Sequence, residues 1–106
     1  MISPWNFPLL LGLIDAIPAG CAVLVKPSEV TPRFIEPLTR LVPPELPLRV
    51  IEGDGSTGAA MVGLIDAVAF TGSVPTGRLV AEAASRAFIP AFLELGGKNP
   101  AIVLTY

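Results

Sequence analysis

The sequence has 106 residues and a formal net charge of −2, and only 15% of its residues are charged, against about 25% in an average soluble domain. Seven Lys and Arg residues are scattered along the chain and form no basic patch, which argues against a nucleic-acid partner. One cysteine and no histidine argue against disulfide scaffolds, metal sites and histidine-based catalysis, so any chemistry would depend on carboxylates, lysine and backbone dipoles.

The apolar content also limits where the chain can reside. Its longest apolar stretch, from Phe7 to Ala19, is interrupted by Asp15 and Pro18 and is shorter than the roughly 18 residues of a membrane span. No secretion signal is recognised at the start, so we expect a cytoplasmic protein without a transmembrane helix. Hydrophobic residues make up 52% of the chain. A chain of this size cannot bury them all, so we expect an oligomer or another association through exposed apolar surface.

The first half of the chain predicts a helix, a strand and a second helix. A helix is expected from Pro8 to Ile17, ended by Pro18 and the following glycine, and a buried strand is expected from Ala22 to Val25. Thr31 followed by a proline is a good helix start, which predicts a helix from Thr31 to Leu41. Pro37 lies inside that range and is expected to kink or shorten the helix.

The second half alternates strands and helices in the same way. After a proline-rich loop, the expected elements are strand Leu48–Ile51, helix Thr57–Leu64, strand Ala67–Phe70, helix Val74–Ala87, and strands Ala91–Leu95 and Ala101–Leu104. Such alternation predicts an α/β fold, with helices on both faces of a parallel sheet in a three-layer, Rossmann-like arrangement. We expect an incomplete version of that fold, because the predicted elements begin inside a loop and end on a strand, with no capping element at either end.

Two glycine-bearing junctions are candidates for binding phosphate. Gly53, Gly55 and Gly58 match the spacing of the dinucleotide fingerprint between a strand and a helix. The acidic residue expected about 20 positions later is absent, so a tight turn is the alternative interpretation. Gly72 and Ser73 precede another predicted helix, whose N-terminal amides could also bind phosphate.

Three further residues could carry binding or catalysis. Lys26 and Glu29 follow the first buried strand and could together bind a ribose diol, although a solvated loop is the alternative. Glu94 lies in an apolar strand, where burial beside leucines would make it a stronger general base, although a solvated face or an ion pair, such as one with Lys98, is the alternative. Cys21 begins a buried strand with no clear cationic neighbour, so we interpret it as structural.

Four blocks of sequence together resemble the aldehyde dehydrogenase superfamily, which uses NAD or NADP. In chain order they are Pro4-Trp5-Asn6-Phe7-Pro8, Val25-Lys26-Pro27-Ser28-Glu29, Phe70-Thr71-Gly72-Ser73 and Leu93-Glu94-Leu95-Gly96-Gly97-Lys98. The resemblance covers essentially the whole chain. It implies a partial coenzyme-binding domain over residues 1–92, followed by the first strands of a catalytic domain over residues 93–106. The Ile17–Cys21 link is shorter than in the family pattern, which would shift the first helix.

The resemblance also implies a role for each matching residue. Asn6 would donate to the oxyanion of a thiohemiacetal, and Glu94 would be the general base. The residues implied in coenzyme binding are Trp5, which lies near the coenzyme, Lys26 and Glu29 at the adenosine ribose, Gly53 near the adenosine, Gly72 and Ser73 at the pyrophosphate, and Leu95 near the nicotinamide. NAD is expected over NADP, because Glu29 would repel a phosphate on the ribose.

The implied reaction is thiol addition to a small-molecule aldehyde, hydride transfer to NAD(P) and hydrolysis of the thioester to a carboxylic acid. The family's nucleophilic cysteine would lie a few dozen residues after Glu94, so the isolated chain is expected to be inactive. Two alternatives stay open. The chain could be a non-catalytic nucleotide-binding module that associates with other chains, or it could fold only within a larger assembly.

Overall fold

The computed structural model describes residues 1–6 and 15–104. The predicted alternation of strands and helices is confirmed. The elements are β1 (Val23–Val25), a short 3-10 helix η1 (Pro32–Phe34), α2 (Ile35–Leu41), β2 (Leu48–Val50), α3 (Gly55–Val62), β3 (Val68–Gly72), α4 (Val74–Ala87) and β4 (Ala91–Leu95). Most of the predicted helix Pro8–Ile17 lies outside the described residues, and of its described part Asp15 and Ala16 are helical.

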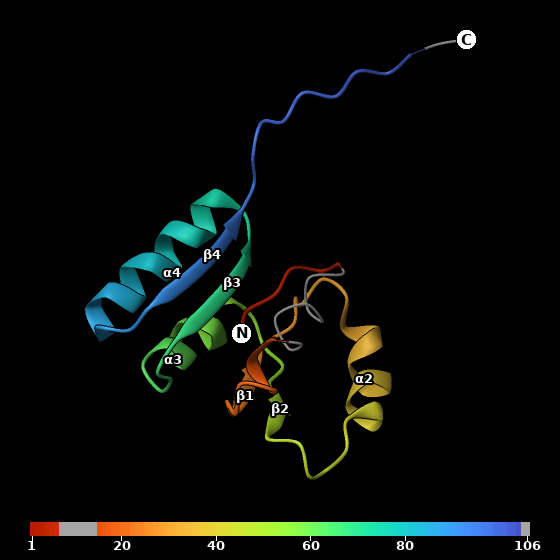
Figure 1. Cartoon of the computed structure of the whole chain (residues 1–106), viewed down its shortest axis with the longest axis vertical. Helices are drawn as coiled ribbons and strands as arrows, with labels where there is room; N and C mark the ends of the chain where they lie inside the picture. Colours follow the sequence, from red (N-terminus) through yellow and green to blue (C-terminus); the bar gives the residue numbers. More distant parts are fainter. Residues whose placement is uncertain (7–14, 105–106) are drawn as a thin grey trace.

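The strands pair in parallel, as predicted. β1 pairs with β2, and β3 pairs with β4 along its whole length, from Val68 opposite Ala91 to Gly72 opposite Leu95. The N-terminal tripeptide joins these two pairs, because Ile2 forms parallel bridges to both Lys26 and Phe70. The strands therefore lie in the order β2, β1, the bridge at Ile2, β3 and β4 (Figure 1).

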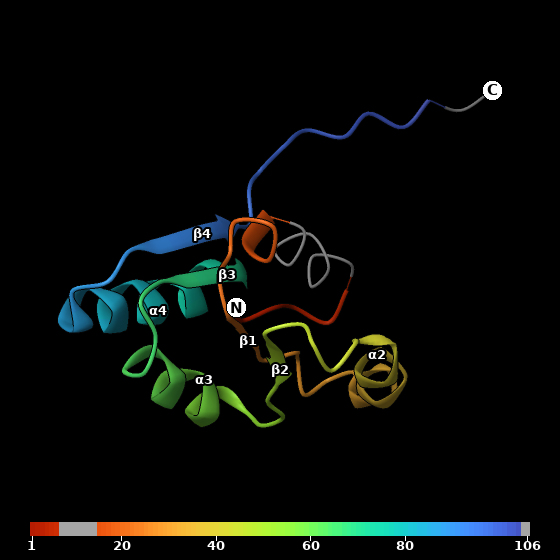
Figure 2. The ribbon, with the colours of Figure 1, turned by 60° about the horizontal axis from the view of Figure 1, so that its bottom comes forward.

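Helices cover both faces of this sheet. Residues paired across a parallel ladder point to the same face, so Ile2, Lys26 and Phe70 share one face, and Val25 faces the other side. The first face carries an apolar core of Val62, Val68, Phe70, Val80 and Ala84, built with α3 and α4. The second face carries a core of Val23, Val25 and Leu48, packed against Phe34, Leu38 and Ile17. Figure 2 shows α3 and α4 on one side of β3 and β4, which completes the expected three-layer arrangement.

The region of α2 differs from the prediction. Thr31 makes no side-chain cap, and its hydroxyl instead donates to the carbonyl oxygen of Trp5 at 3.2 Å. Pro32 opens a 3-10 turn, and the α-helix begins only at Ile35. Pro37 is thus the third residue of α2, where a backbone N–H has no partner within the helix. The α-helix is shorter than predicted, which is one of the two effects expected of Pro37, and a proline in the first turn removes no helical hydrogen bond whose loss would cause a kink.

The predicted strand Ala101–Leu104 is also wrong. These residues have no regular secondary structure, and Ile102, Val103 and Leu104 are 74–87% exposed. The segment after β4 runs away from the rest of the molecule (Figure 1), so no neighbouring strand is at hand to pair with it. A β-prone sequence forms a strand only where a partner supplies hydrogen bonds. Within residues 1–6 and 15–104, no helix is long and apolar enough to cross a membrane.

Candidate functional site

The candidate residues meet at one edge of the sheet. Because the strands are parallel, the loops that follow β1, β2, β3 and β4 all leave the sheet at the same end. These loops carry Lys26 and Glu29, then Gly53, then Gly72 and Ser73, and finally the residues after Leu95. Open α/β sheets bind ligands outside the carboxyl ends of their strands.

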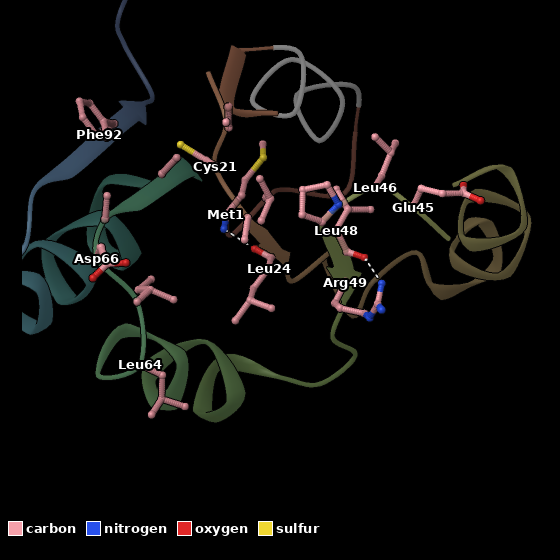
Figure 3. Close-up of a pocket in the computed structure, with 18 of the residues that line it drawn as sticks. Met1, Cys21, Leu24, Glu45, Leu46, Leu48, Arg49, Leu64, Asp66 and Phe92 are labelled. Carbon is pink, nitrogen blue, oxygen red and sulfur yellow. Dashed lines mark hydrogen bonds between the residues drawn. The ribbon is translucent and has the colours of Figure 1, made fainter. Parts of the chain in front are cut away.

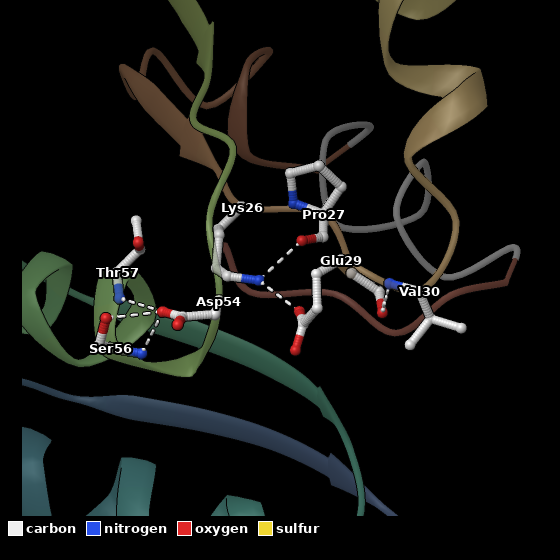
Figure 4. A network of polar contacts seen from close by, with 8 residues as sticks. Lys26, Pro27, Glu29, Val30, Asp54, Ser56 and Thr57 are labelled. Carbon is white, nitrogen blue, oxygen red and sulfur yellow. Dashed lines mark hydrogen bonds and ion pairs between the residues drawn. The ribbon is translucent and has the colours of Figure 1, made fainter.

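Lys26 and Glu29 form an ion pair. Lys26 Nζ lies 3.0 Å from Glu29 Oε2 and also donates to the carbonyl oxygen of Pro27 at 2.8 Å (Figure 4). The Lys26 side chain is only 4% exposed, whereas that of Glu29 is 56% exposed. The pKa of Glu29 is lowered, first by a hydrogen bond from its own backbone amide and then by Lys26. The pair presents an ionised, accessible carboxylate held by a buried ammonium.

The loop before α3 is a tight turn, and the first backbone amides of α3 already donate to the side chain of Asp54. Gly53 has a φ of +151°, and a Cβ atom there would lie 2.1 Å from Thr57 Oγ1, so only glycine fits. Asp54 is the N-cap of α3 and accepts hydrogen bonds from the backbone amides of Ser56 at 2.9 Å and Thr57 at 3.4 Å. A carboxylate on these amides competes directly with a phosphate. The geometry favours the tight-turn interpretation of this loop.

The start of α4 has a neutral cap. Ser73 Oγ accepts a hydrogen bond from the amide of Thr76 at 3.3 Å, and α4 covers the predicted range Val74–Ala87. Gly72 packs against the ring of Phe70, where a Cβ atom would come within 2.6 Å of Cζ. Unlike the start of α3, the start of α4 carries no negative cap, and its helix dipole can attract an anion.

Trp5 and Asn6 lie exposed in the segment that follows the bridge at Ile2. Trp5 is 62% exposed, and its carbonyl oxygen is held by the hydroxyl of Thr31. Ser3 lies just before them, and its amide donates to the carbonyl oxygen of Lys26 at 3.1 Å. This backbone bond places the segment beside the end of β1, next to the Lys26–Glu29 pair.

Glu94 is exposed on β4, so the buried environment expected from its leucine neighbours is not found. Its register partner is Thr71, which points away from the face that α4 covers, and Glu94 points the same way. Leu95 points to the opposite face and packs against Gly77, where a Cβ atom would lie 2.4 Å from Leu95 Cδ2. In the described residues no hydrogen bond joins Asn6 and Glu94, and both side chains are exposed.

Cys21 lies at the opposite end of β1 from Lys26. The thiol is exposed and precedes the strand, so the expectation that it begins a buried strand is wrong. It lines a cavity of about 1000 Å³ at the amino ends of β1, β2 and β3, together with Leu24, Leu48, Arg49 and Phe92 (Figure 3). None of the candidate coenzyme or catalytic residues, all in the described part of the chain, lines this cavity.

Asp54 and Ile2 are the residues that reasoning from the sequence missed. An acidic residue before Gly-Ser-Thr is a recognisable N-cap pattern, so Asp54 could have been found. The bridging role of Ile2 could not, because three residues before a proline give no periodicity to interpret.

Comparison with known proteins agrees with the resemblance. The model of the Aldehyde dehydrogenase family matches residues 1–106. A 4,4'-diapolycopene-4,4'-dial dehydrogenase from Cytobacillus firmus is 44% identical to the chain, over 97% of this chain and 24% of the relative. The chain therefore spans about a quarter of the length of such relatives.

The solved structures that the chain resembles are also aldehyde dehydrogenases. The aldehyde dehydrogenase PutA from Anabaena variabilis is 60% identical with a TM-score of 0.83, over 93% of this chain and 23% of that structure. A betaine aldehyde dehydrogenase from Staphylococcus aureus, solved in complex with NAD+, is 38% identical with a TM-score of 0.74, over 93% of this chain and 22% of that structure.

Proposed function

This chain belongs to the aldehyde dehydrogenase family, and we propose that it forms the coenzyme-binding part of an aldehyde dehydrogenase that uses NAD. The observation that carries this proposal is the Lys26–Glu29 pair at the carboxyl end of β1, at the same end of the parallel sheet as the neutral N-terminus of α4. The NAD+ complex of the related betaine aldehyde dehydrogenase supports NAD as the coenzyme.

Each residue at the carboxyl ends of the strands is assigned to the part of the dinucleotide that it would contact. Glu29 would accept hydrogen bonds from the hydroxyls of the adenosine ribose, while Lys26 would donate to them. Gly72 and Ser73 would lie against the pyrophosphate, since the start of α4 is open to an anion. Trp5, Gly53 and Leu95 would line the remaining path of the dinucleotide. NAD bound there would supply the acceptor for hydride from the substrate.

Catalysis belongs to the whole enzyme, and its roles here are proposals from the family pattern. Asn6 would donate its side-chain amide to a developing oxyanion, and Glu94 would accept a proton from the attacking thiol or water. Both side chains are exposed, so neighbouring parts of a complete enzyme could reach them. The substrate would be a small-molecule aldehyde, and the product a carboxylic acid.

The remaining predictions concern organisation and location. We propose residues 1–92 as part of the coenzyme domain and residues 93–106 as the start of the catalytic domain. β4 pairs with β3 across this boundary, so the boundary would lie within a strand. Association with other chains would cover exposed side chains such as Leu41, Leu64 and Phe88. A cytoplasmic location stays a prediction.

A titration of the purified 106-residue chain with NAD tests the coenzyme proposal. Trp5 is the sole tryptophan and lies beside the proposed site, so its fluorescence should change on binding. Replacing Glu29 with Gln should weaken NAD binding severalfold, since the ribose loses a charged acceptor. Glu36→Gln is the matched control, because it removes another exposed, ion-paired carboxylate, which lies on α2 and pairs with Arg40. Equal NAD affinity in the wild-type chain and in E29Q would contradict the ribose assignment.

A further inference from the structure

Asp54 fills the positive end of α3 with a negative charge. Its Oδ1 accepts from the backbone amide of Ser56 at 2.9 Å, from Ser56 Oγ at 2.6 Å and from the amide of Thr57 at 3.4 Å. These contacts hold the carboxylate in one place. They also use the donors through which a phosphate would otherwise bind at this helix.

The same carboxylate is turned toward the start of α3, yet it lies near enough to the Lys26–Glu29 pair for its charge to act on Glu29 (Figure 4). The stem of Lys26 packs against Gly58, since a Cβ atom at Gly58 would lie 3.6 Å from Lys26 Cδ. Gly58 is one helical turn after Asp54, and its amide donates to the carbonyl oxygen of Asp54 at 3.3 Å. Figure 4 shows the side chains of Lys26, Glu29 and Asp54 together at the ends of β1 and β2.

The charge of Asp54 acts on the Glu29 carboxylate. The pKa of Glu29 is lowered by the hydrogen bond from its own amide and by Lys26, while the charge of Asp54 acts in the opposite direction. The network therefore holds one ammonium and two carboxylates, which leaves the ribose-binding edge with an excess of negative charge.

We propose that Asp54 is a specificity-determining residue, which works with Glu29 to exclude a ribose that carries a 2'-phosphate. This inference rests on the proposed coenzyme site. Glu29 would compete for the position of the phosphate itself, whereas Asp54 would repel it through space and deny it the amides of α3. A phosphate monoester carries a charge of about −1.5 to −2 at neutral pH, so it is repelled, while an unmodified ribose is not.

The test compares two ligands that differ only in that phosphate. Adenosine 5'-monophosphate and adenosine 2',5'-bisphosphate are titrated into the wild-type chain and into Asp54→Asn, with NAD and NADP as the second pair. Asparagine caps a helix as well as aspartate, so Asp54→Asn removes the charge and keeps the fold. Asp54→Ser is a second variant with a neutral cap. Glu45→Gln is the control, because it removes one charge at the amino ends of the strands.

The expected result is that both Asp54 variants bind the 2'-phosphorylated ligands roughly threefold to tenfold more tightly than the wild-type chain, with affinity for the other two ligands little changed. Raising the salt concentration should narrow this difference, because the repulsion is screened. If the Asp54 variants bind NAD but have the same ratio of NADP affinity to NAD affinity as the wild-type chain, only the role of Asp54 would be overturned. Failure of the wild-type chain to bind either member of a pair would overturn the coenzyme site and this inference with it.

Discussion

Gly72 leaves the space that the ring of Phe70 occupies, since a Cβ atom at Gly72 would lie 2.6 Å from Phe70 Cζ. Phe70 is only 5% exposed and belongs to the core beneath α3 and α4. The ring cannot move aside without disturbing that core. The glycine at this junction therefore serves packing as well as the proposed contact with pyrophosphate.

Gly72→Ala should lower the free energy of unfolding by about 1–3 kcal/mol, the usual cost of overpacking a core. Urea unfolding followed by circular dichroism measures it. Gly55→Ala is the matched control, because a Cβ atom there has no neighbour within 4 Å and the residue begins α3. That control should be neutral or stabilising by up to about 1 kcal/mol. Equal stability of the two variants would contradict the packing argument.

Ile2→Pro should break the connection between the two strand pairs. The amide of Ile2 donates to the carbonyl oxygen of Ala69 at 2.8 Å, and proline has no such donor. Leaving that carbonyl without a partner should cost about 1–3 kcal/mol of unfolding free energy. Ile2→Val keeps the donor and most of the side chain, so it should cost about 1 kcal/mol or less. If Ile2→Val lowered the urea midpoint as much as Ile2→Pro, the hydrogen bond would not be the cause.

Asp54→Ala should lower the melting temperature, whereas Asp54→Asn should largely preserve it. Alanine cannot accept the bonds that Ser56 and Thr57 donate, while asparagine can. Thermal unfolding at neutral pH measures the difference. A loss in Asp54→Asn as large as that in Asp54→Ala would mean that charge, and not capping, supplies the stability.

The contribution of Asp54 should also depend on pH. Its pKa is lowered from the ordinary 3.8, first by the Ser56 side chain and then by the backbone amides of Ser56 and Thr57. The group is more acidic in the folded chain, so its contribution is fully present above 3.8 and is lost as the pH falls through the lowered pKa. The wild-type chain should therefore lose more stability than Asp54→Asn in melts recorded from neutral pH to well below 3.8. Parallel curves for the two proteins would contradict this.

The 106-residue chain should bind NAD without oxidising aldehydes. The family reaction needs a thiolate beside the carbonyl carbon, and the only thiol among these residues is Cys21. Cys21 lies before β1, at the end of the strand opposite the Lys26–Glu29 pair. The measurement is NADH absorbance with NAD and a panel of aliphatic and aromatic aldehydes, with Cys21→Ala as the control. Sustained turnover that disappears in Cys21→Ala would show that this thiol reaches the nicotinamide.

The sequence by itself determined the type and order of the elements. The range of α4 and of β4 followed directly from their periodicity and from Ser73 and Pro75, because capping and helix-start preferences act over a few neighbouring residues. The parallel sheet followed from the alternation of strands and helices. The position of Lys26 and Glu29 at the carboxyl end of β1 could be predicted as well, because both residues closely follow a buried strand, whereas their ion pair was not predicted.

Strand pairing and side-chain burial were decided only by the tertiary structure, because they depend on residues that are distant in the sequence. Ile2 became the link between two strand pairs because β1 and β3 stand on either side of it. Glu94 is exposed because the face of β4 that it shares with Phe92 lies opposite α4, a fact that the apolar neighbours in sequence could not reveal. Residues 101–104 have strand-forming side chains but no strand beside them. Burial and pairing are properties of the assembled fold, so local sequence cannot specify them.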